Sequence, residues 1–333
     1  MKRLLVTGCA GFIGSNFVRY MLSKYPDYQL VILDKLTYAG NLANLADVAD
    51  NPNYRFVRGD ICDQQLVDGL VAEVDTVVNF AAETHVDRSI LDAGSFIQTD
   101  VYGTFVLLEA VKKHKTQRFL QVSTDEVYGD IPVGSSVETD PFRPRSPYSA
   151  SKAGGEMMVQ AYHVTYELPT LITRGSNNYG PYQYPEKLIP VLITNALDDK
   201  ELPIYGDGQQ IRDWLYVMDH CSAIDLVLHE GQIGEAYNVG GGNERANLDI
   251  AGKVLELLGK PRSLLKYVKD RPGHDRRYSL GCGKLNKLGW APARNFEEGL
   301  EETVRWYVDN QAWWRPLKSG EYWEYYKQNY KSL

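Results

Sequence analysis

A tyrosine and a lysine four residues apart, Tyr148 and Lys152, are the first pair in the sequence whose types and spacing could do chemistry. At this spacing on a helix, the two side chains lie one above the other. A free phenol has a pKa of about 10, and a neighbouring ammonium favours the phenolate. The pair could therefore act as a general base near neutral pH. Tyr20 and Lys24 have the same spacing with no other reactive residue nearby, so the pattern alone is weak.

A second group, Thr124, Asp125 and Glu126, follows directly after an apolar run that predicts a strand over 118–123. Two adjacent carboxyls whose pKa values differ could work as an acid and a base. Neighbours on a regular strand point to opposite faces. Both carboxyls therefore reach one ligand only if the strand ends or bulges here, and the turn predicted at 127–129 is compatible with that.

Three glycines, Gly8, Gly11 and Gly14, follow the first predicted strand and open the first predicted helix. Such a turn brings backbone N–H groups and the positive end of the helix dipole to a diphosphate. Asp34 ends the second predicted strand, where a carboxylate accepts hydrogen bonds from both ribose hydroxyls of adenosine. This favours NAD over NADP, although the adjacent Lys35 weakens the preference. Asp60 and Ile61, after the third strand, are placed to reach the adenine.

These residues need a scaffold that alternates strands with helices. Apolar runs predict buried strands, and one apolar face predicts a first helix from Phe12 to beyond Leu22. The other predicted strands are 4–7, 30–34, 55–60, 76–81 and 170–175, and the other predicted helices are 96–115 and 149–167. This alternation predicts an α/β fold with a Rossmann-type doubly wound parallel sheet.

The rhythm changes after residue 180, where loop-rich segments separate shorter elements. We therefore expect a cofactor-binding domain over 1–180 and a smaller substrate-binding lobe over 181–333, with some later elements returning to the sheet. The segment 306–330 is dense in Trp and Tyr and predicts a terminal helix packed on the body.

Composition excludes several classes. The chain has 333 residues, 44% of them hydrophobic, and a net charge of −7, which disfavours general nucleic-acid binding. It contains no apolar run long enough to cross a membrane, and its start shows no secretory leader. The four cysteines, Cys9, Cys62, Cys221 and Cys282, show no spacing typical of a disulfide framework or a metal site, and neither do the histidines. Four histidines are predicted to be ordinary helix or surface residues: His114, His163, His220 and His229. We expect a soluble cytoplasmic protein without a metal.

Taken together, the glycine turn, the acid after the second strand, the hydroxyl residue near the end of the fifth strand and the Tyr-x-x-x-Lys pair resemble the extended short-chain dehydrogenase/reductase family. The resemblance covers nearly the whole chain and implies NAD as cofactor, with Thr124, Tyr148 and Lys152 as the catalytic set. The cofactor contacts that it implies, together with those derived above, are Gly8, Gly11, Phe12, Ile13, Gly14, Asp34, Lys35, Thr37, Asp60, Ile61, Ala81, Ala82, Thr99, Tyr148, Lys152 and Asn178.

Within that family, Thr124-Asp125-Glu126 and the segments 81–89, 174–181, 185–190, 210–214 and 270–275 are similar to the dTDP-glucose 4,6-dehydratases. The implied reaction begins when Tyr148 takes the proton of the sugar 4-hydroxyl while C4 gives a hydride to NAD. Glu126 then removes the C5 proton, Asp125 protonates the departing 6-hydroxyl, and the hydride returns to C6. The product is a 4-keto-6-deoxy sugar.

The resemblance also implies residues that bind the nucleotide sugar, with Arg212 and Arg271 as the candidates for phosphate. The full set is His85, Thr124, Asn177, Lys187, Leu188, Pro203, Tyr205, Arg212, Asn247, Arg271 and His274. It further implies a homodimer formed through the helices at 96–115 and 149–167. Cys9 departs from the family, which usually has glycine there, so its backbone must avoid positive φ.

Other functions remain open at this stage. A UDP-glucose 4,6-dehydratase or a nucleotide-sugar 4-epimerase would share most of these motifs. A non-catalytic NAD-sensing scaffold would share the fold, although none of the catalytic residues is missing here. Sequence alone leaves the organism, the pathway and the choice between thymine and uracil undetermined.

Overall fold

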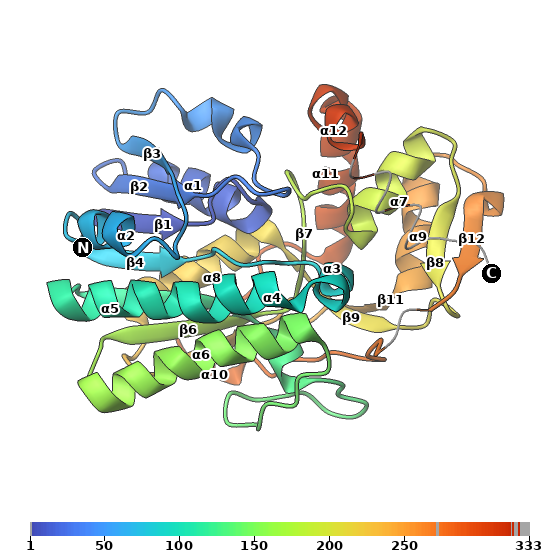
Figure 1. Ribbon diagram of the computed structural model, residues 1–333. Coiled ribbons are helices and arrows are strands. Elements are labelled where there is room, and N and C mark those ends of the chain that lie inside the picture. Colours follow the sequence, from blue (N-terminus) through green and yellow to red (C-terminus); the bar gives the residue numbers. More distant parts are fainter. Residues whose placement is uncertain (1, 271–272, 321, 323–325, 327–333) are drawn as a thin grey trace.

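The computed structural model describes residues 2–270, 273–320, 322 and 326 (Figure 1). At its centre is a seven-stranded sheet with the order β10-β6-β5-β4-β1-β2-β3, in which every pair of neighbours is parallel. The strands are β1 Arg3–Thr7, β2 Gln29–Asp34, β3 Tyr54–Arg58, β4 Thr76–Asn79, β5 Arg118–Thr124, β6 Thr170–Gly175 and β10 Ala236–Val239. The predicted fold class is confirmed. The order reverses between β1 and β4, and ligands bind beyond the carboxyl ends of strands at such a point.

Helices cover both faces of this sheet. Successive residues of β1 show why, because Leu4 and Val6 belong to one buried core while Leu5 belongs to the other. The first core is covered by α1 Phe12–Lys24 and α8 Val217–Glu230, and the second by α2 Gln64–Val71, α5 Thr104–His114 and α6 Pro147–Tyr166. Helices α5 and α6 lie side by side across the front of Figure 1.

The helix predicted over 96–115 is divided in the structure. Helix α3 Val86–Leu91 and the short α4 Ala93–Phe96 lead into η2 Ile97–Gly103, a π-helical segment that continues into α5. Helix α6 begins earlier than predicted because Ser146 caps its first turn and Pro147 occupies the first helical position. It ends where Glu167 turns left-handed.

The remaining elements build the second lobe, which has its own core around Trp214, Tyr307 and Trp314. Two small sheets, β11-β9-β7 and β12-β8, lie among its helices. The remaining strands are β7 Asn177–Tyr179, β8 Leu202–Tyr205, β9 Ile211–Tyr216, β11 Glu244–Ala246 and β12 Leu265–Val268. The remaining helices are α7 Leu188–Leu197, α9 Asn247–Leu257, α10 Gly283–Asn286, α11 Phe296–Asp309 and α12 Gln311–Leu317. The 3₁₀ segments of the described chain are η1 Leu42–Val48, η3 Asp125–Tyr128 and η4 Arg262–Leu264. Strand β10 and helices α8 and α10 return to the large sheet although all three follow residue 180, and Leu285 of α10 belongs to the core that α1 and α8 cover.

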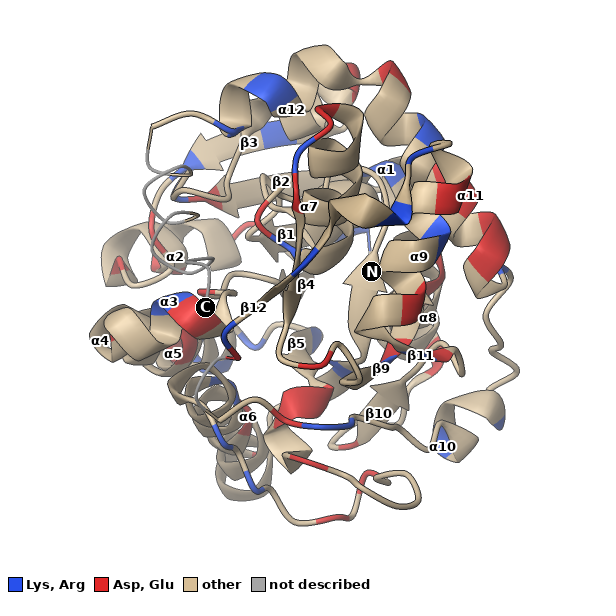
Figure 2. Ribbon diagram, turned by 90° about the vertical axis from the view of Figure 1, so that its right-hand side faces the viewer, with Lys and Arg blue, Asp and Glu red and all other residues tan. Residues whose placement is uncertain are grey.

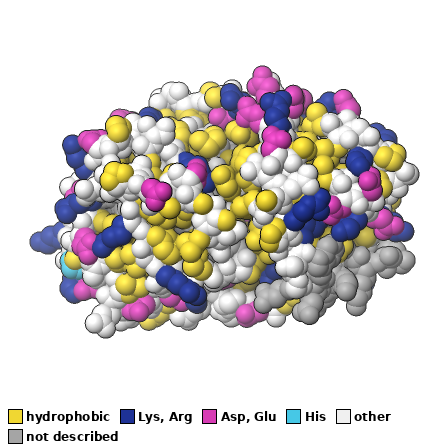
Figure 3. Space-filling model, turned by 90° about the horizontal axis from the view of Figure 1, so that it is seen from above, with side chains coloured by type: hydrophobic (Ala, Val, Ile, Leu, Met, Phe, Trp, Pro, Cys, Tyr) yellow, Lys and Arg dark blue, Asp and Glu magenta, His cyan; other side chains and the backbone are white. Residues whose placement is uncertain are grey.

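The surface mixes charges of both signs. Figure 2 shows acidic residues along α11, where the basic Arg305 pairs with Glu301 at 2.9 Å. Figure 3 shows charges of both signs scattered over the upper face. Among the described residues, no helix is long and apolar enough to cross a membrane. The aromatic segment predicted to pack on the body does so where it is described, since Trp314 is buried; residues 321, 323–325 and 327–330 lie outside the described part.

Candidate active site

The glycine turn after β1 is a close backbone packing that side chains would prevent. Gly8 has φ +68°, and a Cβ there would lie 2.6 Å from the backbone nitrogen of Ala81. A Cβ on Gly14 would lie 2.7 Å from the carbonyl oxygen of Gly8. Cys9 is not among the residues with positive φ, and its side chain is fully buried. The turn therefore accommodates the cysteine and leaves the N-terminus of α1 open at the end of β1.

The acid at the end of β2 holds this turn in place. Asp34 is buried, and its two carboxylate oxygens accept hydrogen bonds from the backbone N–H groups of Ala10 and Leu36, each at 2.8 Å. Burial raises the pKa of Asp34, and the two backbone hydrogen bonds oppose that shift. The Lys35 ammonium lies 2.7 Å from Asp60, so its charge is already paired. The objection that Lys35 raised against an NAD site is therefore weakened.

A cavity of about 300 Å³ lies beyond the carboxyl ends of the strands. Every residue predicted to bind the cofactor lines this cavity, from the glycine turn to Asn178. Thr124, Asp125 and Glu126 line it too, as do Asn177 and Lys187 of the predicted substrate contacts. The chain thus brings one predicted cofactor site and one predicted catalytic set to a single cavity.

Both neighbouring carboxyls reach the cavity because β5 ends at Thr124 and a 3₁₀ turn, η3, starts at Asp125. Thr124 caps this turn, with its hydroxyl accepting from the backbone N–H of Glu126 at 3.3 Å and donating to the Asp125 carboxyl at 3.2 Å. The end of the strand removes the alternation that would have sent the two side chains to opposite faces.

Electrostatics separates the groups of the site. Burial raises the pKa of Asp125 well above its usual value, and the charges of Glu126 and Asp213 add to the effect. Burial also raises the pKa of Tyr148, with further contributions from Glu126 and Asp100. Tyr148 therefore holds its proton near neutral pH in the chain alone, and Asp125 is shifted toward its protonated form. For Tyr148, the neighbouring ammonium does not outweigh burial and the nearby carboxylates.

Lys152 is buried, and its ammonium donates to the carbonyl oxygen of Val122 at 2.8 Å. Burial lowers its pKa, while Asp100 and Glu156 oppose that shift. The lysine is thus fixed to the end of β5, one helical turn beyond Tyr148.

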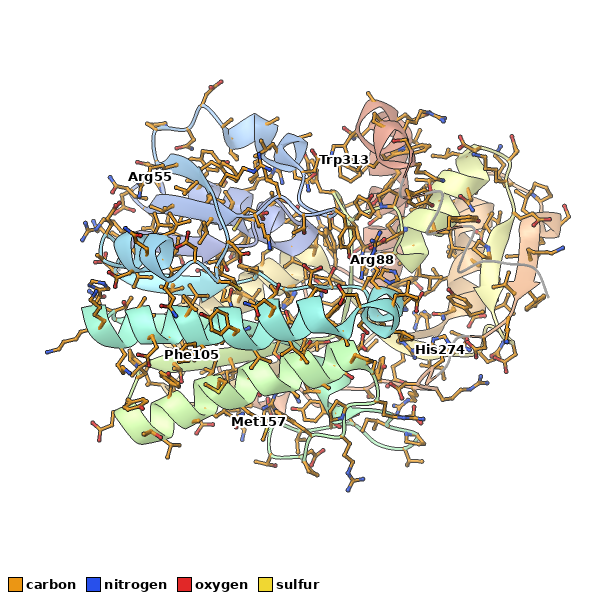
Figure 4. All side chains as sticks on the ribbon, viewed as in Figure 1. Arg55, Arg88, Phe105, Met157, His274 and Trp313 are labelled. Atoms are coloured by element: carbon orange, nitrogen blue, oxygen red, sulfur yellow. The ribbon has the colours of Figure 1, made fainter. Side chains whose placement is uncertain are left out.

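Most other residues predicted to bind substrate do not line the cavity, and the majority lie in the second lobe. Arg212 donates to the carbonyl oxygens of Ile211 and Asp275 at 2.8 and 2.9 Å and lies over the Tyr278 ring. The Tyr205 hydroxyl donates to Asp87 at 3.3 Å, and His274, labelled in Figure 4, lies 2.6 Å from Asp270. The residues outside the cavity lining are His85, Leu188, Pro203, Tyr205, Arg212, Asn247 and His274. Arg271 lies outside the described residues.

His220 lies on helix α8, in agreement with its prediction as a helix residue, but its place in the cavity was not predicted. It is buried and lines the cavity, where it faces Gly175 at the end of β6. Its Nδ1 lies 3.0 Å from the Asn178 side-chain oxygen, which makes Nδ1 the donor and leaves Nε2 as an acceptor. Burial lowers its pKa to about 3, so the ring is neutral. Its spacing on the chain carries no motif, and only the fold brings it here.

Several other residues that sequence reasoning missed line the same cavity. Two of these residues contact Arg88, which is labelled in Figure 4: Glu186 pairs with it at 3.1 Å, and its guanidinium lies over the Tyr38 ring. Glycines and prolines in these loops indicated only turns. The missed lining residues include Tyr38, Gly40, Gly59, Phe80, Glu83, Thr84, Val122, Ser123, Ser176, Gln183, Tyr184 and Glu186.

The cavity also contains buried polar atoms that have no hydrogen-bond partner among the described residues: Ser123 Oγ, Asp125 Oδ2, Ser176 Oγ, Asn177 Oδ1 and His220 Nε2. Buried polar atoms in folded proteins are nearly always paired, with protein, water or ligand. Their concentration beside Tyr148, together with a glycine turn that no side chain could fill, fits a dinucleotide lying along the strand ends with a polar second ligand beside it.

Comparison with known proteins agrees with this geometry. The family model described as GDP-mannose 4,6 dehydratase matches residues 5–303. A dTDP-glucose 4,6-dehydratase of Streptomyces niveus is 55% identical over 324 residues, covering 96% of each chain. The solved dTDP-glucose 4,6-dehydratase DesIV of Streptomyces venezuelae, with NAD and TYD bound, has a TM-score of 0.93 at 53% identity, covering 95% of this chain and 100% of that one. A UDP-glucose 4-epimerase of Thermotoga maritima has a TM-score of 0.86 at 30% identity, covering 93% of this chain and 99% of that one.

Proposed function

The chain belongs to the GDP-mannose 4,6 dehydratase family, and we propose that it acts within it as an NAD-dependent dTDP-glucose 4,6-dehydratase. The reaction converts dTDP-glucose into dTDP-4-keto-6-deoxyglucose and water, so the enzyme is a hydro-lyase. The observation that best supports this function is that Asp125 and Glu126, both in the turn η3, line the same cavity as Tyr148 and Lys152.

When bound, NAD accepts a hydride from C4 of the glucose ring and later returns it to C6. Tyr148 takes the proton of the 4-hydroxyl as the C4–H bond breaks. Because the chain alone holds this phenol protonated, the base becomes available only when positive charge enters the cavity with the cofactor. Lys152, buried beside it, supplies the other positive charge and is placed to hold the nicotinamide ribose.

The 4-ketone formed in this way makes the C5 proton acidic. Glu126 removes that proton as a carboxylate, and Asp125 gives its own proton to the departing 6-hydroxyl, which leaves as water. The environment of Asp125 suits the acid role, since burial and the neighbouring Glu126 keep it protonated. Once the hydride held by NAD has been returned to C6, Glu126 would give its proton back to C5. Tyr148 would then release to solvent the proton that it took from the 4-hydroxyl, and Asp125 would take one up from solvent, so that all three groups recover their starting states.

The same cavity supports NAD as the cofactor. The glycine turn and the N-terminus of α1 would hold the diphosphate, and Asp34 would accept from the adenosine ribose. Asp60 and Ile61 would flank the adenine. The remaining contacts proposed for NAD are Phe12, Ile13, Lys35, Thr37, Ala81, Ala82, Thr99 and Asn178, all of which line the cavity.

We propose that the second lobe, mainly residues 181–333, holds the nucleotide. Asn177 and Lys187 line the cavity where it meets this lobe, and the Lys187 ammonium donates to the carbonyl oxygen of Thr84 at 2.6 Å. Arg212, buried behind Asp125, supplies a positive charge that the pKa of Asp125 already senses. Arg271 is proposed as its partner on the diphosphate, and the loop around Tyr205 as the cover of the base.

We also propose a homodimer formed through α5, η2 and α6. Apolar side chains are exposed along these neighbouring elements, among them Ile97, Tyr102, Met157 and Val164, the last 81% exposed. Phe105 and Met157 mark the two helices in Figure 4. Such a run on adjacent helices is typical of a helix-packing interface. Multi-angle light scattering should give twice the chain mass of 37.7 kDa, and replacing Met157 and Val164 by glutamate should give 37.7 kDa. A wild-type mass of 37.7 kDa would exclude the dimer.

Two enzyme alternatives and one binding function are less well supported. A 4-epimerase needs no acid–base pair for elimination, and the epimerase compared here is 30% identical, against 53% for DesIV. A scaffold would not need the catalytic set that the chain retains. The cytoplasm remains the predicted location, which cell fractionation would test.

The decisive experiment is to incubate the protein with dTDP-glucose and to measure the absorbance of the 4-keto-6-deoxy product in alkali. Turnover of UDP-glucose but not of dTDP-glucose would correct the base, and formation of a 4-epimer would correct the reaction. Glu126→Gln should lower product formation by about 10²–10⁴-fold while the first oxidation stays measurable at 340 nm. Tyr148→Phe should abolish that oxidation. Glu230→Gln, at an exposed position, is the matched control and should keep full activity.

A further inference from the structure

One buried carboxyl lies beside the catalytic pair and has no role in the proposed mechanism. Asp100 stands in the π-helical segment η2 and is 2% exposed. One of its carboxylate oxygens lies 2.5 Å from the Ser151 hydroxyl, and the other accepts from the backbone N–H of Glu83 at 3.2 Å. It does not belong to the cavity lining, so it does not reach a ligand directly.

The backbone around Asp100 is packed directly on α6. A Cβ on Gly155 would collide with the Asp100 carbonyl oxygen, so only glycine permits this approach. That same oxygen accepts from the Thr104 hydroxyl at 2.7 Å. The Ser151 hydroxyl also lies 2.8 Å from the Tyr148 carbonyl oxygen. The π-helical turn thus presents one carboxylate to the stretch of α6 that carries the catalytic pair, and π-turns are frequent at functional sites.

Asp100 interacts electrostatically with both members of that pair. Its charge is the larger of the two carboxylate contributions that hold up the pKa of Lys152 against burial, the other being Glu156. It also raises the pKa of Tyr148, after burial and Glu126. Glu156 is paired with Arg174 in a fully buried ion pair, which reduces its net effect on Lys152. Of the two carboxylates that raise the pKa of Lys152, Asp100 therefore has the larger effect.

Other charged groups face Asp100 from the elements packed around it. Glu83, in the loop after β4, has a pKa raised to about 7 by burial and by Asp100. The pKa of Asp100 itself is raised to about 6 by burial, against Lys152 and the Ser151 hydrogen bond, which lower it. Asp100 thus carries its charge at neutral pH and loses it in mildly acidic solution.

We propose that Asp100 is a positioning residue whose buried negative charge sets the pH range in which Tyr148 and Lys152 hold their working protonation states. A buried charge acts strongly because little water screens it. Its removal stabilises the phenolate and destabilises the ammonium, so both groups release their protons at lower pH. The inference deepens the proposed function, since it concerns the base of that reaction.

The test is Asp100→Asn, which keeps the shape and can still pair with Ser151 and the Glu83 N–H while the charge is lost. Both limbs of the pH profile of kcat/KM should move to lower pH, by about one pH unit. Ser151→Ala is the matched control for the alkaline limb: it removes a hydrogen bond that lowers the pKa of Asp100, but the carboxylate stays charged throughout the alkaline range. Its alkaline limb should stay at the wild-type pH. Coincident limbs for Asp100→Asn and wild type, in protein of wild-type melting temperature, would overturn the proposal.

A second readout does not need turnover. Calorimetric titration of NAD into each variant across pH 6–10 reports the protonation of Lys152 through the dissociation constant. The alkaline loss of affinity should occur at lower pH in Asp100→Asn than in wild type or Ser151→Ala, and an unchanged dependence would contradict the proposal. Should Asp100→Asn not fold, Asp100→Ser takes its place with the same expectations. A protein that binds NAD with this dependence but does not dehydrate dTDP-glucose would refute the proposed function alone.

Discussion

Replacing Asp125 by asparagine separates the stability of the site from its chemistry. The side chain is 4% exposed, and its Oδ2 has no hydrogen-bond partner among the described residues. Burial, followed by the charge of Glu126, raises its pKa well above the usual value. The proposed acid role requires the wild-type group to be a neutral acid at neutral pH, and asparagine is the neutral isostere of that form. The variant should fold normally but should be unable to give a proton to the departing hydroxyl.

The magnitude follows from proton linkage. The unfolded carboxyl releases its proton above a pKa of about 3.9, whereas the folded one retains it. From there up to the folded pKa, each pH unit costs the wild type about 1.4 kcal/mol of stability. Asparagine does not incur this cost, so Asp125→Asn should become more stable relative to wild type as pH rises. With an unfolding entropy of about 2.1 cal/mol/K per residue, the gap in melting temperature should widen by about 2 °C per pH unit.

Differential scanning calorimetry at pH 5, 6 and 7 measures this gap. The variant should gain about 4 °C on the wild type between pH 5 and 7. Product formation from dTDP-glucose should fall by about 10²–10⁴-fold over the same range, with the first oxidation retained. A gap that does not change with pH would show that Asp125 is ionised in the folded protein, and the assignment of the acid would then be refuted.

Three further predictions concern the cofactor site and the body of the protein. Gly14→Ala places a Cβ 2.7 Å from the Gly8 carbonyl oxygen and should weaken NAD binding at least about tenfold by calorimetric titration, with unchanged affinity contradicting the proposed diphosphate site. His220→Phe removes both ring nitrogens and should weaken NAD binding about tenfold; because the imidazole is neutral above pH 5, any step in affinity between pH 6 and 7, where Asp100 and Glu83 titrate, should be the same in the variant as in wild type, and a step that the variant loses would refute the neutral ring. Burial lowers the pKa of His229, but its hydrogen bonds with Asp225 prevail and raise it, so the stabilisation is complete below about pH 6.5 and is lost as pH rises through the folded pKa. His229→Asn should therefore melt below wild type at pH 6, with the difference disappearing by pH 9, and a difference independent of pH would contradict the pairing.

The parts of the molecule that local pattern determines were predicted well. Residues of β1 are buried on both faces, and such strands read as continuous apolar runs that are visible without any partner. The glycine turn was equally clear because its conformation is a property of a few neighbouring residues. The strand ends were predicted less well: β3 stops at Arg58 and β4 at Asn79, before the predicted 60 and 81, because those last residues turn toward the cavity.

What sequence could not predict depends on residues that meet only in the folded chain. His220 is a buried histidine on α8, and no residue near it in the sequence distinguishes it from His163. What distinguishes it is its contact with Gly175, which forms only in the folded chain. The π-helical turn of η2 has no signature in its own sequence. It is accompanied by the packing of Gly155 against the Asp100 carbonyl oxygen, and this contact joins residues that are distant in the sequence. The fold alone likewise determines that the Arg212 guanidinium donates to the carbonyl oxygens of Ile211 and Asp275.

The protonation states of the ligand-free site also suggest how the steps are ordered. Tyr148 holds its proton in the chain alone and Asp125 is shifted toward its protonated form, in each case by burial and by Glu126. Tyr148 in this state cannot remove a proton before the cofactor arrives. Positive charge that enters with the cofactor favours ionisation of Tyr148, the group that must act first. In the proposed mechanism Asp125, which lies on η3 beside the carboxylate of Glu126, keeps its proton until the 6-hydroxyl departs. The charge of Glu126 would hold up the pKa of Asp125 until Glu126 takes the C5 proton, and Asp125 could then release its own proton.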